Sequence, residues 1–167
     1  TPDTAAMQVL QHDNREGLER IRAVTHDLRL FTRMQERVVV EEDLNSSIRS
    51  AISLLRNELR HHARLRLELE EGLPKLAARR GKLGQVATNL LMNAIQATTE
   101  GSADIHEIRV VTQSDGKEII FSVADSGSGM SEETLARVFE PFFTTKTQEQ
   151  GTGLGLALCS SIVESHG

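Results

Sequence analysis

A line of uncharged amide side chains runs along the helix that the sequence predicts over Lys82–Thr98. Its members share one side of the helix because they are spaced at i, i+4, i+8 and i+11: Gln85, Asn89, Asn93 and Gln96. Exposed helix sides usually carry Glu, Lys and Arg, yet no charged residue lies between Lys82 and Glu100. Carboxamide oxygens suit a hard cation such as Mg²⁺, especially one held partly by phosphates. The line is therefore a candidate cation site, with an ordinary polar face as the alternative.

A single carboxylate, Asp125, ends the predicted strand Glu118–Ala124 and opens the segment DSGSGM. No Lys or Arg lies within six residues of it, so an ion pair is not its evident role. Gly127 and Gly129 allow a sharp turn and the close approach of a flat ligand. We expect this strand to be central and buried, and Asp125 to accept a hydrogen bond from an exocyclic amine. Taken alone the motif is weak, because many strand-to-helix turns look similar.

Three alternate glycines, Gly151, Gly153 and Gly155, close the segment FFTTKTQEQGTGLGLAL. Glycines before a helix let backbone N–H groups approach a phosphate at the helix N-terminus. The spacing fits neither the dinucleotide fingerprint nor the P-loop. Lys146 lies where an ammonium could meet a phosphate, although an ordinary surface lysine is the alternative. Phe139 and Phe142 are expected to form a hydrophobic latch beside it.

The composition limits the classes of protein to which this chain can belong. The net charge of −5 over 167 residues argues against a nucleic-acid partner, which would usually face a basic stripe. The single cysteine, Cys159, excludes an internal disulfide and favours a reducing compartment. Its helical spacing from Leu156 and Ile162 places it in a core rather than at a reactive site. No apolar run is long enough to span a membrane.

The elements that must position these residues alternate in type along the chain. We predict helices over 44–59, 82–98, from Ser131 and from 153–155 to Ser165, and strands over 64–70, 108–113 and 118–124. Residues at helical spacing in the second of these helices should face a core: Leu83, Val86, Leu90, Ala94 and Ala97. The order favours an α/β two-layer sandwich, with a mixed sheet and helices on one face.

The first 38 residues are of a different kind. Apolar residues at heptad-like spacing predict a long helix over Met7–Val38, which needs a partner helix. A surface helix packed on its own domain is the alternative.

Four segments in fixed order resemble one family closely. NLLMNA, DSGSGM, FEPFFTTK and GTGLGL are similar to the N, G1, F and G2 boxes of sensor histidine kinases of the nitrogen-sensor type. Their catalytic ATP-binding domain belongs to the GHKL superfamily, with gyrase B, heat-shock chaperone and mismatch-repair ATPases. The resemblance covers about Leu44–Gly167 and implies the Bergerat fold, Mg²⁺ and ATP.

The resemblance also implies roles for single residues. Asn93 matches the metal-binding asparagine, Asp125 the adenine-binding aspartate, and Asn89, Asn93 and Lys146 are the catalytic candidates. The other residues expected to line the nucleotide lie in the last three boxes or shortly after the first: Gln96, Ala97, Gly127, Gly129, Met130, Phe142, Gly151, Thr152, Gly153, Leu154, Gly155 and Leu156.

One position separates the branches of this superfamily. The ATPases carry a glutamate, the general base for water, where this chain has Asn89. An amide cannot accept a proton near neutral pH, so we expect poor hydrolysis and transfer of the γ-phosphoryl to an external histidine. A GHKL-type ATPase and a nucleotide-sensing module without catalysis are the alternatives.

The acceptor histidine is expected upstream of this chain. His26 in THDLRLF lacks the proline that follows kinase acceptors, and the helix around it resembles the second helix of a dimerisation hairpin. We therefore divide the chain into 1–38, a partial dimerisation helix, and 39–167, a catalytic domain without its C-terminal strands. The family implies a bacterial, cytoplasmic protein, homodimeric through its hairpin and acting on a response-regulator receiver domain. A membrane anchor upstream stays open.

Overall fold

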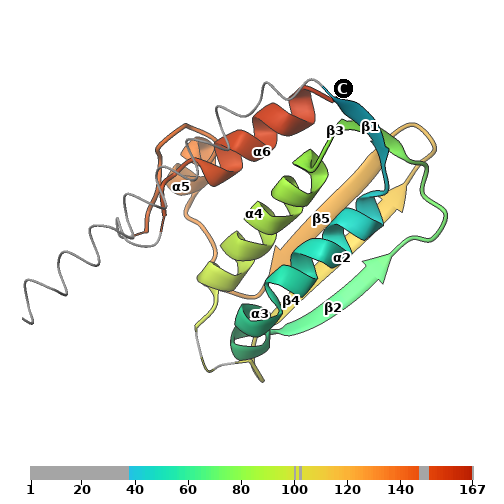
Figure 1. Cartoon of the computed structure of the whole chain (residues 1–167). Coiled ribbons are helices and arrows are strands. Elements are labelled where there is room, and N and C mark those ends of the chain that lie inside the picture. Colours follow the sequence, from blue (N-terminus) through green and yellow to red (C-terminus); the bar gives the residue numbers. More distant parts are fainter. Residues whose placement is uncertain (1–37, 100, 102, 147–150, 167) are drawn as a thin grey trace, which may run out of the picture.

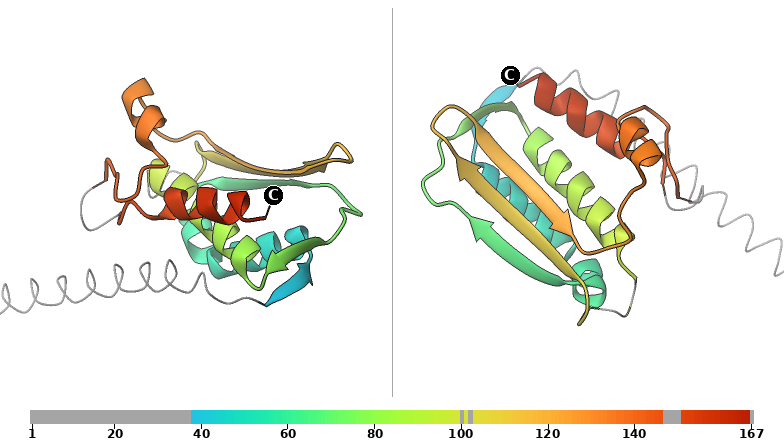
Figure 2. Two further views of the ribbon diagram at one scale, coloured as in Figure 1. Left: turned by 90° about the horizontal axis from the view of Figure 1, so that it is seen from above. Right: turned by 180° about the vertical axis from the view of Figure 1, so that it is seen from behind.

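The computed structural model describes residues 38–99, 101, 103–146 and 151–166. The predicted helix over Met7–Val38 lies outside these residues except for Val38. The described chain forms two layers, with helices on one face of a mixed three-stranded sheet (Figures 1 and 2). This arrangement confirms the α/β class that the alternation of elements predicts.

The sheet has the strand order β2-β4-β5 and comprises β2 (Arg64–Leu69), β4 (Glu107–Ser114) and β5 (Ile119–Asp125). β2 runs parallel to β4, and β5 returns antiparallel through a tight turn in which the Asp115 N–H donates to the Glu118 carbonyl oxygen. In the alternating segment RLRLEL, Leu65 and Leu69 pack against the core under the helices, whereas Leu67 is 39% exposed. The charged residues of β2 occupy the other face, where Glu68 pairs with Arg66 and Arg109. All three strands lie where the sequence predicts them.

Five helices accompany the sheet in the described residues. They are α2 (Leu44–Leu54), α3 (Arg56–His62), α4 (Lys82–Ala97), α5 (Glu132–Arg137) and α6 (Gly155–Glu164). The Asp43 carboxylate caps α2 by accepting from the Ser46 N–H, and Ser131 caps α5 in the same way. The predicted helix over 44–59 is divided at Leu55 into α2 and α3. Within the described residues, no helix is long and apolar enough to cross a membrane.

The core lies between α2, α4 and the sheet, where Ile48, Leu91, Ile108 and Val110 are fully buried. α4 lies between α2 and α6 and is covered by the sheet on its third side (Figure 1). Its buried face is therefore wider than the predicted one. Three apolar residues of α4 that the prediction omitted are buried: Ala87, Leu91 and Ile95. Three that it included are only partly buried: Leu83, Leu90 and Ala97.

A second, two-stranded sheet was not predicted. β1 (Val39–Glu42) pairs antiparallel with β3 (Leu76–Arg79), which lies beyond α2, α3 and β2 in the chain. Each strand has four residues, and the alanines of β3 carry no strand preference. Only the partner strand makes them a ribbon, so the sequence pattern could not reveal it.

Candidate functional site

The amide line of α4 faces α6, on the opposite flank from α2. The Asn89 Nδ2 donates to the carbonyl oxygen of Gly155 at 3.2 Å, which joins the middle of α4 to the first residue of α6. Gln85 departs from the predicted line because its Oε1 accepts from the buried Lys82 ammonium at 3.1 Å. The amide line of the site therefore comprises Asn89, Asn93 and Gln96.

The Lys146 ammonium lies against this line. Its Nζ donates to the Asn93 Oδ1 at 3.2 Å and to the Gln96 Oε1 at 2.6 Å. Burial lowers the pKa of the Lys146 ammonium. Two carboxamide oxygens thus already face a cation, and this donor set suits Mg²⁺ that takes its remaining ligands from phosphate and water. The residues present therefore fit the metal that the sequence motifs predict.

The carboxylate of Asp125 lies at the end of β5, on the face of the sheet that the helices cover. In the β4–β5 register Asp125 is opposite Ile108, and Val123 is opposite Val110. Opposed residues of an antiparallel pair project to the same face, and Ile108 and Val110 are buried under the helices. Asp125 is nevertheless exposed, because β5 is the last strand of the described sheet. The expectation of a central, buried strand end is wrong.

The loop after Asp125 is fastened to the C-terminal end of α4. The Asp125 Oδ1 accepts from the Gly127 N–H at 2.9 Å, and the Ser128 N–H donates to the Ala97 carbonyl oxygen at 2.9 Å. A Cβ on Gly127 would overlap the Ala97 carbonyl oxygen and lie 2.7 Å from the Ala97 Cβ. Gly127 is therefore required by the close approach of α4, whereas Gly129 adopts a φ of 69° that favours glycine.

The chain on the two sides of residues 147–150, which we call the lid, is held together at a structure that we call the lid neck, formed by residues 142–146 and 151–153. The Phe142 N–H donates to the Gly153 carbonyl oxygen at 2.9 Å. Gly153 has a φ of 68°, and a Cβ there would lie 2.7 Å from the Phe142 carbonyl oxygen. A Cβ on Gly151 would lie 2.9 Å from the Thr144 Oγ1, which also accepts from the Lys146 N–H. Gly153 is thus needed to close the neck beside Lys146, whereas a Cβ on Gly151 would meet a side chain that can shift.

The start of α6 offers backbone donors. Its N-cap residue, Leu154, makes no side-chain cap hydrogen bond, and the Leu154 side chain is buried. The first amides of an uncapped helix can bind an anion such as a phosphate. The buried Leu154 side chain therefore cannot contact a phosphate, and the Leu154 N–H donates to the Thr152 Oγ1 at 3.4 Å.

The apolar latch predicted beside the lid is not observed. Phe139 is 58% exposed and Phe142 is 69% exposed, and Phe142 has a φ of 66°. The ring of Phe143 instead contacts the Arg137 guanidinium, which lies 4.2 Å from the ring centre. Met130, another predicted nucleotide contact, is 59% exposed. These side chains leave apolar surface free next to the lid neck.

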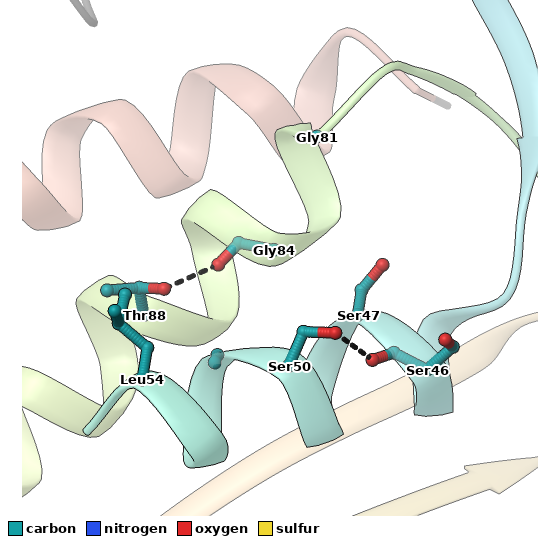
Figure 3. Close-up of a pocket in the computed structure, with 8 residues that line it drawn as sticks. Ser46, Ser47, Ser50, Leu54, Gly81, Gly84 and Thr88 are labelled. Atoms are coloured by element: carbon teal, nitrogen blue, oxygen red, sulfur yellow. Dashed lines mark hydrogen bonds between the residues drawn. The ribbon is translucent and has the colours of Figure 1, made fainter. Parts of the chain in front are cut away.

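A pocket on the other flank of α4 has different chemistry. It lies between α2 and α4 and is lined by serines, glycines and one threonine, with Leu54 at one end (Figure 3). The hydroxyls of Ser50 and Thr88 donate to carbonyl oxygens of their own helices, those of Ser46 and Gly84. None of the motif residues lines this pocket, so it is separate from the predicted nucleotide site.

Comparison with known proteins identifies the arrangement. Residues 78–167, more than half of the chain, match the family described as "Histidine kinase-, DNA gyrase B-, and HSP90-like ATPase". The chain belongs to this ATPase family. The matched region contains α4, Asp125, the lid neck and α6, and so every element of the candidate site.

Relatives within the family are sensor kinases. The sensor histidine kinase ZraS of Escherichia coli (strain K12) is 35% identical over 151 residues, which cover 89% of this chain and 31% of ZraS. The chain thus spans about a third of the length of this curated relative.

Solved histidine kinases have the same fold. The catalytic domain of the histidine kinase ThkA, in a nucleotide-free form, matches with a TM-score of 0.67 at 35% identity, covering 77% of this chain and 82% of that domain. ThkA in complex with the response regulator protein TrrA matches with a TM-score of 0.67 at 28% identity, covering 87% of this chain and 41% of ThkA. The two-layer fold predicted from the motifs is therefore confirmed.

The sequence missed one contributor to the site, Thr144, and the structural contact made by another, Ala97, which was expected only to line the nucleotide. Thr144 holds the lid neck through its hydroxyl, and the Ala97 carbonyl oxygen fastens the loop after Asp125. Thr144 lies within the F-box segment, so its position gave a signal that was not used. The backbone carbonyl of Ala97 gave none, because every residue has one.

Proposed function

We propose that this chain is the ATP-binding catalytic part of a sensor histidine kinase. It binds Mg²⁺ and ATP and transfers the γ-phosphoryl to a histidine on a dimerisation hairpin, from which a response regulator receives it. The homodimer forms through that hairpin. The relatives named as sensor histidine kinases and the ThkA–TrrA complex support this assignment.

The observation that carries the proposal is the position and bonding of Asn89. Hydrolysis in this superfamily needs a base that accepts a proton from water. Asn89 instead donates to the Gly155 carbonyl oxygen and links α4 to α6. The described neighbours of Asn89 along the amide line are Asn93, Gln96 and Lys146, and two amides and an ammonium cannot accept a proton from water in its place. A bound ATP would therefore keep its γ-phosphoryl until a nucleophile arrives from outside.

The remaining residues bind and orient the nucleotide. Asp125 accepts a hydrogen bond from the exocyclic amine of adenine, while the loop from Gly127 to Gly129 lets the flat base approach. The uncapped amides of α6 and the Lys146 ammonium bind phosphate oxygens. Asn93 holds Mg²⁺, which neutralises phosphate charge when bound. Phosphoryl transfer requires mainly such positioning and neutralisation, and these groups provide both.

A chimaera tests the proposal. Residues 39–167 of this chain would replace the matching segment of ZraS, so that a dimerisation hairpin is present. Incubation with Mg²⁺ and labelled ATP should give acid-labile, base-stable phosphate on the chimaera, and an Asn93→Ala version should give none. Steady release of phosphate without protein labelling would favour the ATPase instead. Nucleotide binding with neither outcome would favour a sensing module.

The separation of transfer from hydrolysis can be tested on the same position. Asn89→Glu restores the carboxylate of the ATPases at the point where α4 meets α6. We expect it to raise phosphate release in the absence of an acceptor, and Asn89→Gln, which keeps an amide, to leave release low. If both variants release phosphate at the same rate, the base argument fails.

A further inference from the structure

The contact between Lys146 and the amide line indicates a role for this lysine at the metal site, which rests on the proposed function and goes beyond it. Asn93 and Gln96 lie three residues apart on α4, so their side chains project side by side. The Lys146 ammonium donates to the carboxamide oxygen of both residues, and the 2.6 Å bond to Gln96 is short. The oxygens expected to face Mg²⁺ are thus bonded to a cation of the protein itself.

We propose that Lys146 is the resident cation of the metal site, which excludes free divalent cations until a nucleotide arrives and draws the ammonium to its phosphates. Two positive charges cannot share these oxygens without strong repulsion at such short range. Each carboxamide oxygen directed at the ammonium is also less available as a ligand. A metal that enters alone must displace Lys146 with nothing to receive it. A metal that enters with ATP brings phosphates that can bind the displaced Lys146 ammonium.

Because its partners are amides and not carboxylates, Lys146 can exchange reversibly between the amide line and a phosphate. Neutral carboxamides bind an ammonium less strongly than carboxylates do. Among the described residues, no carboxylate forms an ion pair with Lys146, although four other ion pairs lie elsewhere on the surface. A carboxylate at position 93 or 96 would hold the lysine too firmly for phosphate to remove it. The amides keep it in place only while no stronger partner is present.

The lid neck keeps Lys146 within reach of both partners. Its N–H is bonded to the Thr144 Oγ1, and the neighbouring Phe142 is bonded to Gly153 at the start of the glycine run. Lys146 thus follows a backbone hydrogen bond from Phe142 to Gly153, and Gly153 lies two residues before the start of α6. A lysine side chain has enough rotatable bonds to move between the amide line and a phosphate while this backbone stays fixed.

The test measures binding of Mn²⁺, as a paramagnetic substitute for Mg²⁺, to the nucleotide-free chain by electron paramagnetic resonance. We expect weak binding by the wild type and at least about tenfold tighter binding by Lys146→Met, because the competing charge is gone. Lys146→Arg keeps the charge and should stay weak. Lys117→Met removes an exposed lysine from the β4–β5 turn and should match the wild type. Adding Asn93→Ala to Lys146→Met should abolish the gain.

A second measurement separates this inference from the proposed function. Fluorescent ATP in the presence of Mg²⁺ should bind Lys146→Met more weakly than the wild type, so the variant changes free-metal and nucleotide affinity in opposite directions. If Lys146→Met does not bind Mn²⁺ more tightly, or if Lys146→Arg binds it equally tightly, the resident-cation role is refuted while nucleotide binding by the wild type still supports the proposed function. If the wild type binds no nucleotide, the proposed function itself is refuted.

Discussion

Replacement of Gly127 by alanine probes the contact between the loop after Asp125 and α4, on which the proposed adenine side of the site depends. The added Cβ would overlap the Ala97 carbonyl oxygen and lie 2.6 Å from the Ala97 carbonyl carbon, so the loop must move away from α4. That movement breaks the bond from the Ser128 N–H to the same carbonyl oxygen, 2.9 Å long. Forced overpacking costs about 1–3 kcal/mol and the hydrogen bond about 1 kcal/mol, so we expect a loss of about 2–4 kcal/mol.

Urea unfolding followed by circular dichroism measures this loss. A domain of this size loses roughly 2–4 °C of melting temperature per kcal/mol, so a thermal scan should show a decrease of roughly 5–15 °C. Gly84→Ala is the matched control, because Gly84 lies within α4 and a Cβ there meets nothing within 4 Å. It should stabilise the chain by about 0.5–1 kcal/mol through helix propensity. If Gly127→Ala unfolds at the wild-type urea concentration, the loop does not approach α4 as described.

Two further predictions concern a ligand contact and a buried thiol. Asp125→Asn should weaken ATP binding by about 1.5–3 kcal/mol, roughly 10- to 100-fold, and relax discrimination against GTP; unchanged affinity in calorimetry would remove Asp125 from the adenine site. Burial raises the pKa of the Cys159 thiol from 9.0 to about 11, so its contribution to stability is present below pH 9 and is lost as the pH rises through 11. A thiol reagent at pH 8 should therefore modify Cys159 only after unfolding, and Cys159→Ala should lack this part of the alkaline fall in stability.

Much of the fold could be predicted because its signals are local. The alternation in β2 and the 3.6-residue period of α2 and α4 depend only on which face of each element is covered. The ribbon of β1 and β3 escaped prediction because two four-residue strands become strands only by pairing with each other. The division between α2 and α3 at Leu55 was missed as well, because apolar spacing continues across it from Ala51 to Leu59.

The sequence predicted that three candidate residues of the site lie near one another, but not how their side chains bond. Asn93, Gln96 and Lys146 do meet, yet the sequence suggested a lysine directed at phosphate rather than at the two amides. Gln85 belongs to the line by spacing, but the side chain bonds to Lys82 instead. A helical wheel gives the direction of a side chain and leaves its partner undetermined, because the partner comes from a distant segment.

The sequence by itself determined the family and the absence of a base at position 89, because motif order and residue type do not depend on packing. It also determined that an acid and a set of glycines stand where a nucleotide-binding family needs them. Only the tertiary structure decided why Gly127 must be glycine and that the Lys146 ammonium donates to the Asn93 and Gln96 oxygens. The physical reason is that both depend on distances of a few ångströms between α4 and loops that follow it much later in the chain. Such distances are set by how the α4 helix packs against the sheet and α6, which no local pattern records.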